Sequence, residues 1–309
     1  MIALYYDGQD TRLAQDYPEP IRAEHESKIK ISLAAICSTD REIMKGYKPD
    51  FTGVLGHEFV GVVTESDDVT LVGKRVVGEL NEGCGECLYC KTGREHHCVN
   101  RRCIGIAGAD GCFAPYMTMA TRLLHVVPDA LEDERAIFTE PLAAAFEICE
   151  QVHIKPSQEV CVIGDGRLAL MITQVLSLTG AQVFVLGRHS EKLERFLPYA
   201  KTMTECTRSF ETVVDACGGP AGMEQAIRLV RSRGTIVLKS TYAKGTEMNL
   251  SPLVVNEISV VGSRCGPFPP ALKALEEGRV TLPEIELFSL SDWEQAFGSR
   301  AFKAGFDFR

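Results

Sequence analysis

One segment constrains the fold more than any other: an apolar run that ends in a glycine turn. Val160–Ile163 are apolar, Gly164 and Gly166 follow, and the small residue Ala169 stands three positions further on. A strand that enters a helix in this way needs the first glycine for a tight turn and the second so that backbone N–H groups can approach a pyrophosphate. The segment therefore predicts a dinucleotide site. We expect contacts from Gly164, Asp165, Gly166, Arg167 and Leu168.

The residues around this turn alternate between apolar strands and helical stretches, the pattern of a doubly wound parallel sheet. Helical spacing covers 222–231, and a bridging helix is predicted over 140–152, where Pro141 is tolerated at a first helical position. The predicted strands are Glu159–Ile163, Gln182–Leu186, Thr212–Asp215, Thr235–Leu238 and Ile258–Val261.

The first 120 residues have a different pattern, with short β-type runs between glycine-rich breaks, which predicts an irregular all-β domain. A chain of 309 residues is long enough for two domains. We place the first at 1–139, the second at 140–266, and a returning C-terminal segment at 267–309. The predicted strands of the first domain are Lys28–Ala35, Phe59–Thr64, Arg75–Val77 and Pro115–Met119.

Composition excludes several classes of protein. A net charge of -9 disfavours nucleic acid as a partner, because that role needs clustered Lys and Arg. No apolar run approaches the roughly 18 residues of a membrane span, and the first ten residues do not resemble a secretion signal. Twelve cysteines in a chain this long fit metal binding and core thiols better than disulfides. We expect a cytoplasmic protein with neither nucleic acid nor membrane as a partner.

The end of the second predicted sheet strand bears on which dinucleotide binds. An NAD site usually has an Asp or Glu about 20 residues beyond the glycine turn, but this chain has Gly187, Arg188 and His189 there. Arg188 can pair with a 2′-phosphate, helped by His189 or Lys192. We therefore predict NADP in preference to NAD. The alternative is that Arg188 is a solvated surface residue and that NAD binds without the usual carboxylate.

Four cysteines with the spacing C-x2-C-x2-C-x7-C lie in and just after a glycine-containing loop. Four thiolates at this spacing can close tetrahedrally on zinc and stabilise a lobe, about 81–99, that lacks its own core. Such a site is structural, because a full four-cysteine shell leaves no position open for a substrate. The ligands are Cys84, Cys87, Cys90 and Cys98.

A second set of metal-binding side chains is dispersed along the chain: Cys37, His57, Glu58 and Glu140. Alone, each is uninformative, since a single cysteine is usually in a core and a single glutamate usually on the surface. Only their combination indicates a site.

This combination, with the four-cysteine loop between His57 and the glycine turn, closely resembles the zinc-containing medium-chain dehydrogenase/reductase superfamily, over nearly the whole chain. The resemblance implies an α/β protein with a GroES-like β catalytic domain that carries both zincs and a Rossmann domain that binds the cofactor. It also implies that the C-terminal segment packs back on the first domain, and that the chain forms a homodimer or homotetramer.

Residue by residue, Cys37 and His57 match the catalytic zinc ligands, and Thr39 matches the hydroxyl that takes the alcohol proton. Glu140, followed by Pro141 and Leu142, matches the acidic ligand of the polyol and threonine dehydrogenases. Glu58 matches a residue that binds the zinc directly in some members and lies beside its ligands in others. Either glutamate therefore fits as the acidic ligand.

The resemblance implies hydride transfer between NAD(P) and the carbinol carbon of an alcohol, polyol or sugar, with the catalytic zinc as a Lewis acid. The string Cys37–Ile43 looks most like the glucose and related sugar dehydrogenases. The chain departs from the family at Ser38, where glycine is usual, and at Glu42, which is often a relay histidine. Two alternatives remain: a zinc-free quinone or enone reductase, and a catalytically silent, dinucleotide-binding redox sensor.

Overall fold

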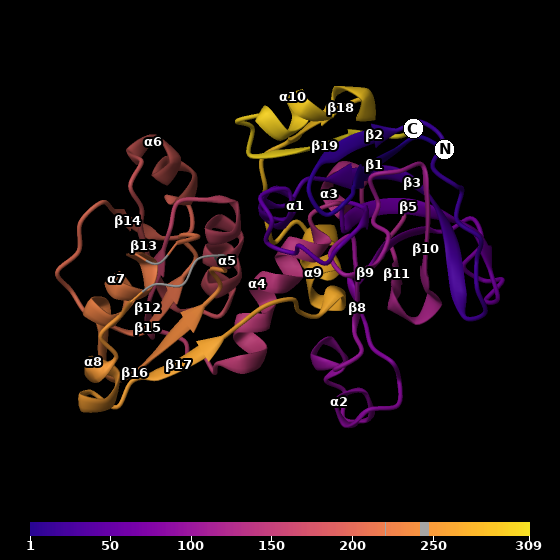
Figure 1. Ribbon diagram of the computed structural model, residues 1–309. Helices are drawn as coiled ribbons and strands as arrows, with labels where there is room; N and C mark the ends of the chain where they lie inside the picture. Colours follow the sequence, from indigo (N-terminus) through magenta and orange to yellow (C-terminus); the bar gives the residue numbers. More distant parts are fainter. Residues whose placement is uncertain (220, 242–246) are drawn as a thin grey trace. The chain divides into compact units, whose positions relative to one another are not determined.

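A computed structural model of the chain describes residues 1–219, 221–241 and 247–309 (Figure 1). The chain divides into two compact units. Unit 1 contains Met1–Glu140 and Ala271–Arg309, and unit 2 contains Pro141–Pro270. Among the described residues, no helix is long and apolar enough to cross a membrane.

Unit 2 is built on a six-stranded sheet whose neighbouring strands are all parallel. Its order is β14-β13-β12-β15-β16-β17, so the direction of winding reverses at β12. Ligands of open α/β sheets bind at the carboxyl ends of the strands beside such a reversal. This confirms the predicted doubly wound sheet. The strands are β12 (Glu159–Ile163), β13 (Gln182–Leu186), β14 (Lys201–Met203), β15 (Phe210–Asp215), β16 (Val230–Leu238) and β17 (Ser259–Gly262).

Helices cover both faces of this sheet, with α5 (Arg167–Leu178) and α7 (Ala221–Leu229) on opposite sides (Figure 1). The helix predicted over 222–231 is two residues too long, because Val230 already belongs to β16 and pairs with Phe210. Both side chains are buried in one core cluster, which favours the extended backbone for this β-branched residue. The shorter helices are α6 (Ser190–Leu193) and α8 (Ser251–Val255), with a 3₁₀ turn at Glu194–Phe196.

Unit 1 is organised around the long strand β3 (Glu26–Ala35), which pairs with three other strands. Ile29 and Ile31 are buried two positions apart in the core cluster of unit 1, and Ala34 joins that cluster after an irregularity in the pairing between Ile31 and Leu33. The sheet order is β11-β6-β5-β3-β19-β18, with β10 also on β3. The partners are β5 (Glu58–Ser66), β6 (Arg75–Gly78), β10 (Tyr116–Ala120), β11 (Leu124–Val126), β18 (Ile285–Phe288) and β19 (Lys303–Asp307).

The C-terminal segment completes this sheet. β19 runs antiparallel to β3, with Gly305 opposite Ala35, and the buried Phe306 packs edge-on against Phe113 at a ring separation of 5.0 Å. The last residues of the chain are therefore part of the core of unit 1. The helices of this segment are α9 (Phe268–Glu276) and α10 (Trp293–Gly298), with a 3₁₀ turn at Leu290–Asp292.

Shorter elements position the loops of unit 1. One small sheet joins β1 (Ala3–Tyr6), β2 (Thr11–Ala14) and β4 (Gly53–Val54), and another joins β7 (Asn81–Glu82), β8 (Arg102–Ile104) and β9 (Gly108–Ala109). The second of these forms the base of the cysteine-rich lobe. The remaining elements are α1 (Ser38–Ile43), α2 (Leu88–Lys91), α3 (Asp133–Ala136), α4 (Thr139–Gln151) and 3₁₀ turns at Glu95–His97 and Thr121–Leu123.

Candidate metal centres and dinucleotide site

Three of the dispersed metal-binding residues come together at one end of the β3–β5 pair. Cys37 follows β3 and caps the N-terminus of α1, while His57 and Glu58 stand at the start of β5. Because Ala35 pairs with Glu58, the chain leaving β3 passes beside the chain entering β5. One potential ligand atom from each of Cys37, His57 and Glu58 lies within 4.8 Å of the others. A thiol, an imidazole and a carboxylate at such separations are a ligand set that suits zinc.

Asp40 supports this set, although the sequence analysis did not identify it. Its buried carboxylate accepts a hydrogen bond from the backbone N–H of Cys37 at 2.7 Å, and its other oxygen lies 3.4 Å from Nδ1 of His57. Burial lowers the pKa of His57, but the carboxylate of Asp40, with Cys37, outweighs that effect and holds the pKa well above its usual value. Asp40 is placed to orient the imidazole ring. The sequence does contain a signal for Asp40, because an acidic residue three positions after the helix cap Cys37 is typical of a capping box.

Lys303 is the second residue that the sequence analysis missed. It reaches the cluster from β19 and forms an ion pair with Glu58, and both side chains are buried. A buried carboxylate needs a nearby positive charge, and Lys303 supplies one. Lys303 engages Oε2 of Glu58, whereas Oε1 has no hydrogen-bond partner among the described residues, which suits an oxygen that faces a metal. Cys112, also buried, donates its thiol to the carbonyl of Glu58 at 3.5 Å.

Two further residues predicted for the catalytic site, Glu140 and Thr39, are not among the three grouped ligands. Glu140 is the second residue of α4 and is not among the three grouped ligand atoms. The hydroxyl of Thr39 lies 3.7 Å from the sulfur of Cys37, in the first turn of α1. The structure therefore groups Glu58 with Cys37 and His57, whereas Glu140 stays a prediction as a ligand.

The four cysteines of the lobe also gather in one place. Ligand atoms from Cys84, Cys87, Cys90 and Cys98 lie within 4.8 Å of one another. The backbone N–H of Cys90, with the neighbouring thiols, lowers the pKa of Cys87 to about 6, while burial raises that of Cys90 to about 12. Thiolates bind metal and thiols do not, so an N–H group directed at Cys87 prepares it as a ligand.

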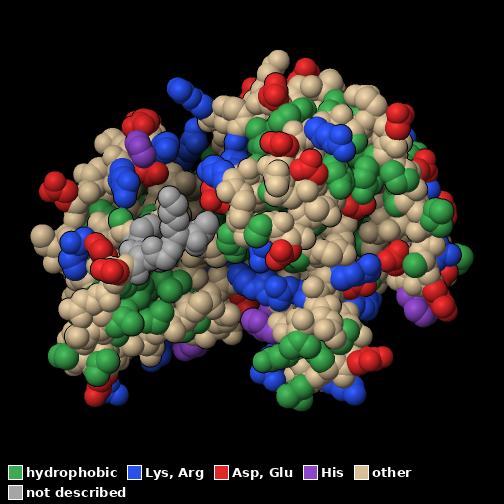
Figure 2. All heavy atoms as spheres, viewed as in Figure 1, with side chains coloured by type: hydrophobic (Ala, Val, Ile, Leu, Met, Phe, Trp, Pro, Cys, Tyr) green, Lys and Arg blue, Asp and Glu red, His purple; other side chains and the backbone are tan. Residues whose placement is uncertain are grey.

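The lobe around these cysteines has little apolar packing of its own. Leu88 is 70% exposed and Val99 is 74% exposed, and hydrophobic side chains are visible on the surface of the α2 region in Figure 2. Arg122 links the lobe to the sheet through an ion pair with Glu95 at 2.6 Å. With so little buried apolar area, an ion bound by the four cysteines would stabilise the shape of the lobe.

The glycine turn of unit 2 fits a dinucleotide. Gly164 has a φ of 130°, and a Cβ atom there would lie 2.7 Å from the carbonyl oxygen of Ala216, so only glycine can occupy it. Gly166 caps α5, and a Cβ there would meet nothing within 4 Å, which leaves open space beside the helix N-terminus. The N–H groups of this first turn, which contains Arg167 and Leu168, have no acceptor within the helix and can bind phosphate.

The other predicted cofactor residues follow β13. Gly187 comes directly after the strand, and Arg188 and His189 precede α6, where Lys192 is exposed. The backbone N–H groups of Arg188 and His189 both donate to the carboxylate of Asp165, at 2.7 and 2.9 Å. The segment after β13 is therefore held directly against the glycine turn.

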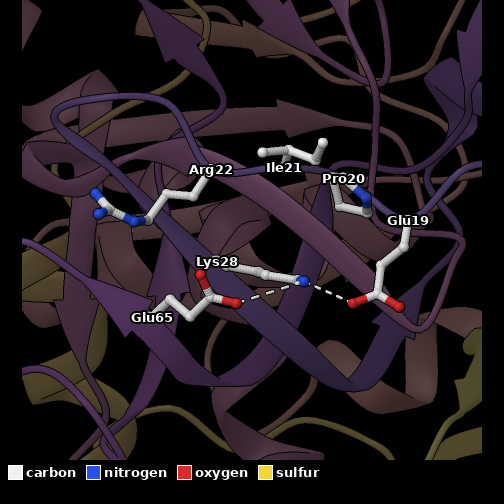
Figure 3. Close-up of a pocket in the computed structure, with 6 residues that line it drawn as sticks. All are labelled: Glu19, Pro20, Ile21, Arg22, Lys28 and Glu65. Carbon is white, nitrogen blue, oxygen red and sulfur yellow. Dashed lines mark hydrogen bonds and ion pairs between the residues drawn. The ribbon is translucent and has the colours of Figure 1, made fainter.

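A shallow hollow on unit 1 lies at the other end of β3 from Cys37 (Figure 3). Lys28 crosses it and pairs with Glu19 at 2.6 Å and with Glu65 at 3.5 Å. Each charged side chain in the hollow already faces an opposite charge, so we assign no catalytic group to the hollow.

The geometry agrees with the comparisons with known proteins. Residues 23–129 match the family model described as the alcohol dehydrogenase GroES-like domain, and residues 168–277 match the one described as zinc-binding dehydrogenase. A sorbitol dehydrogenase of Halalkalibacterium halodurans is 30% identical, over 94% of this chain and 92% of that protein. The chain therefore belongs to the zinc-containing medium-chain alcohol dehydrogenase superfamily, in its polyol dehydrogenase-like branch.

Two solved structures share the fold. A zinc-binding dehydrogenase of Sinorhizobium meliloti 1021, bound to NADP, is 24% identical with a TM-score of 0.87, covering 99% of this chain and 98% of that chain. An alcohol dehydrogenase of Escherichia coli CFT073, complexed with NADH, is also 24% identical, with a TM-score of 0.89, covering 100% and 99%. These structures hold different dinucleotides, so the shared fold does not decide between NAD and NADP.

With the two ligand clusters occupied, we expect two zinc ions per chain. In Cys87→Ser the zinc content should fall to one per chain, because the three remaining thiolates of the lobe hold the ion less tightly. Elemental analysis of the purified variant measures this. Limited proteolysis should also cut the variant faster between residues 81 and 103. Cys206→Ser, in unit 2, is the matched control and should keep both ions. Two zincs in Cys87→Ser would contradict the structural assignment.

The contacts of Asp40 predict that Asp40→Asn weakens zinc binding at the Cys37 cluster by about 10- to 100-fold, a typical effect of losing a carboxylate that orients a histidine ligand. Competition with a chelator measures this, because the zinc of the lobe should resist chelation as in the wild type. Asp50→Asn, an exposed substitution in the same unit, serves as control. An unchanged chelation curve would remove Asp40 from the site.

Proposed function

We propose that this chain is a zinc-dependent dehydrogenase that transfers a hydride between NAD(P) and the carbinol carbon of a polyol or related alcohol. The observation that carries the proposal is the grouping of Cys37, His57 and Glu58. This set occurs in a chain whose second unit has a glycine turn shaped for a dinucleotide.

Each residue of the cluster has a separate task. A zinc ion held by Cys37, His57 and an acidic side chain would polarise the substrate oxygen and lower its pKa. Thr39, beside Cys37, presents a hydroxyl that would accept the proton of the substrate while passing its own proton on to water, so that it acts as a relay. Asp40 fixes the orientation of His57, and Lys303 offsets the negative charge of Glu58.

For the acidic ligand, the geometry favours Glu58, because its oxygens lie in the same cluster as the cysteine and the histidine. Glu140 remains the alternative from the family pattern. If Glu140 is the ligand, Glu58 and Lys303 form a neutral buried pair beside the metal.

The proposed substrate class follows from the relatives. The sorbitol dehydrogenase at 30% identity is named for a polyol, and a D-arabinitol dehydrogenase of Uromyces fabae is 26% identical over 97% of this chain. We therefore place polyols ahead of simple alcohols and sugars. The NADP preference predicted from Arg188 and the missing carboxylate is opposed by Asp165, whose carboxylate accepts hydrogen bonds from the backbone N–H groups of Arg188 and His189.

The two alternative functions explain the cluster less well. A zinc-free reductase or a silent redox sensor would give no role to the convergence of ligand atoms from Cys37, His57 and Glu58 within 4.8 Å of one another.

We also propose a homodimer formed through β17. This strand is at the edge of the sheet and pairs with β16 alone in the described chain. Val260 is 40% exposed on it, and the nearby α8 exposes Val254 and Val255 by 79% and 78%; hydrophobic side chains gather over this region in Figure 2. An open strand edge beside exposed apolar residues favours pairing with the same edge of a second copy.

Cys37→Ser and His57→Ala are each expected to lower polyol oxidation by at least about 100-fold, because the substrate oxygen loses its Lewis acid. NADH binding, followed by fluorescence, should be unchanged. His25→Ala, an exposed substitution in the same unit, should keep full activity. The assay uses sorbitol, arabitol, glucose and ethanol with NAD and NADP, before and after chelation. Chelator-resistant turnover, or full activity in either variant, would refute a catalytic zinc.

For the dimer, Val260→Lys is expected to yield monomers, since it places a charge on the paired edge of each copy. Light scattering after gel filtration gives the mass directly. Val69→Lys, at a 78% exposed position of unit 1, is the matched control. A monomeric wild type, or a variant of unchanged mass, would exclude this interface.

A further inference from the structure

The cofactor site contains the carboxylate of Asp165, which the sequence analysis expects to contact the dinucleotide as part of the glycine turn and not as the residue that binds the ribose. In a sheet of this kind, the acidic residue that binds the ribose usually follows the second strand. Here that strand is β13, and Gly187 follows it. On the sequence alone, the carboxylate is missing.

The structure places Asp165, from the glycine turn, at this position. Its Oδ2 accepts hydrogen bonds from the backbone N–H groups of Arg188 and His189 at 2.7 and 2.9 Å, and lies 2.9 Å from Nδ1 of His189. Burial raises the pKa of Asp165, but the bonds from His189 and Arg188 outweigh it, and the net pKa is lowered. The group is therefore a carboxylate at neutral pH, held in a fixed orientation.

Gly187 is what makes room for it. A Cβ atom at Gly187 would lie 2.7 Å from Cδ2 of Leu193, 2.8 Å from Cβ of Asp165 and 3.1 Å from its Oδ2. The φ of Gly187 is outside the left-handed region, so backbone conformation does not require the glycine. Space does. An acidic side chain at 187 and Asp165 in its present position exclude each other.

We propose that Asp165 is the ribose-recognition carboxylate of this enzyme, supplied from the glycine turn instead of from the end of β13, and that it selects NAD over NADP. The three donors all meet Oδ2, which leaves Oδ1 for the hydroxyls of the adenosine ribose. This inference rests on the proposed function, which requires a dinucleotide in this unit. It reverses the preference predicted from the sequence.

A 2′-phosphate would be disfavoured here for two reasons. The N–H groups of Arg188 and His189, which could bind it, are already engaged by Asp165. The phosphate would also face a fixed carboxylate of the same sign.

The test measures binding and needs no turnover. ADP-ribose and its 2′-phosphate are titrated into the zinc-loaded protein by calorimetry, and NADH and NADPH by fluorescence. The wild type should bind the unphosphorylated ligands at least about tenfold more tightly. In Asp165→Asn this ratio should fall by about tenfold or more, because a hydrogen bond to a charged group is lost and the repulsion of the phosphate disappears.

A matched control and an exchange variant separate recognition from loss of folding. Glu191→Gln removes one negative charge from the exposed surface of α6 and should leave the ratio unchanged. Asp165→Gly and Leu193→Ala combined with Gly187→Asp move the carboxylate to the usual position and make room for it, and should restore the preference for NADH. Gly187→Asp alone, with Asp165 still present, should weaken the binding of both NADH and NADPH.

Each result decides the matter. Tighter binding of NADPH by the wild type, or a ratio that Asp165→Asn does not change, overturns the inference and leaves the dehydrogenase proposal standing. Failure to bind any of the four ligands overturns both. An exchange variant that folds, by its melting curve, but binds without preference would show that Asp165 only holds the loop, and would also overturn the inference.

Discussion

The catalytic chemistry of this protein depends on the register of one strand. β3 is paired on one side with β5, so that Ala35 is opposite Glu58, and on the other with β19, so that Ala35 is also opposite Gly305. A shift of one residue would turn Ile29 and Ile31 out of the core cluster in which they are buried, which the core does not permit. The hydrophobic core thereby fixes how Cys37 approaches His57 and Glu58, and which residue of the C-terminal strand reaches them.

The two metal centres use this framework differently. The cysteines of the lobe are close in sequence, and the chain around them buries little apolar surface, so an ion there contributes directly to folding. The Cys37 cluster is assembled by the sheet, whose core forms from apolar residues alone. The polar groups of that cluster are positioned before a metal binds. The free-energy cost of burying them is balanced by packing elsewhere in unit 1.

The sequence predicts what is local in this protein. The bounds of β12 and β13 and the glycine turn follow from apolar runs and turn residues, and the lobe cysteines follow from spacing. Asp40 and Lys303 were missed for a common reason: each acts on a residue from another element, Asp40 on His57 and Lys303 on Glu58. Sequence patterns describe a residue's own element, whereas a partner across a sheet is fixed by register. The error at the end of α7 is similar, because Val230 is drawn into β16 by its pairing with Phe210.

At the cofactor site, one sequence observation supports two opposite predictions of the preferred dinucleotide. No acidic residue follows β13. A carboxylate from another segment of the chain can nevertheless bind the ribose if it lies at the same place in the fold. The backbone N–H groups of Arg188 and His189 bind an anion, and in this structure Asp165 provides it. The informative residue is Gly187, because a glycine without a left-handed φ needs another explanation. Here the explanation is a neighbouring side chain that fills the volume of the missing one.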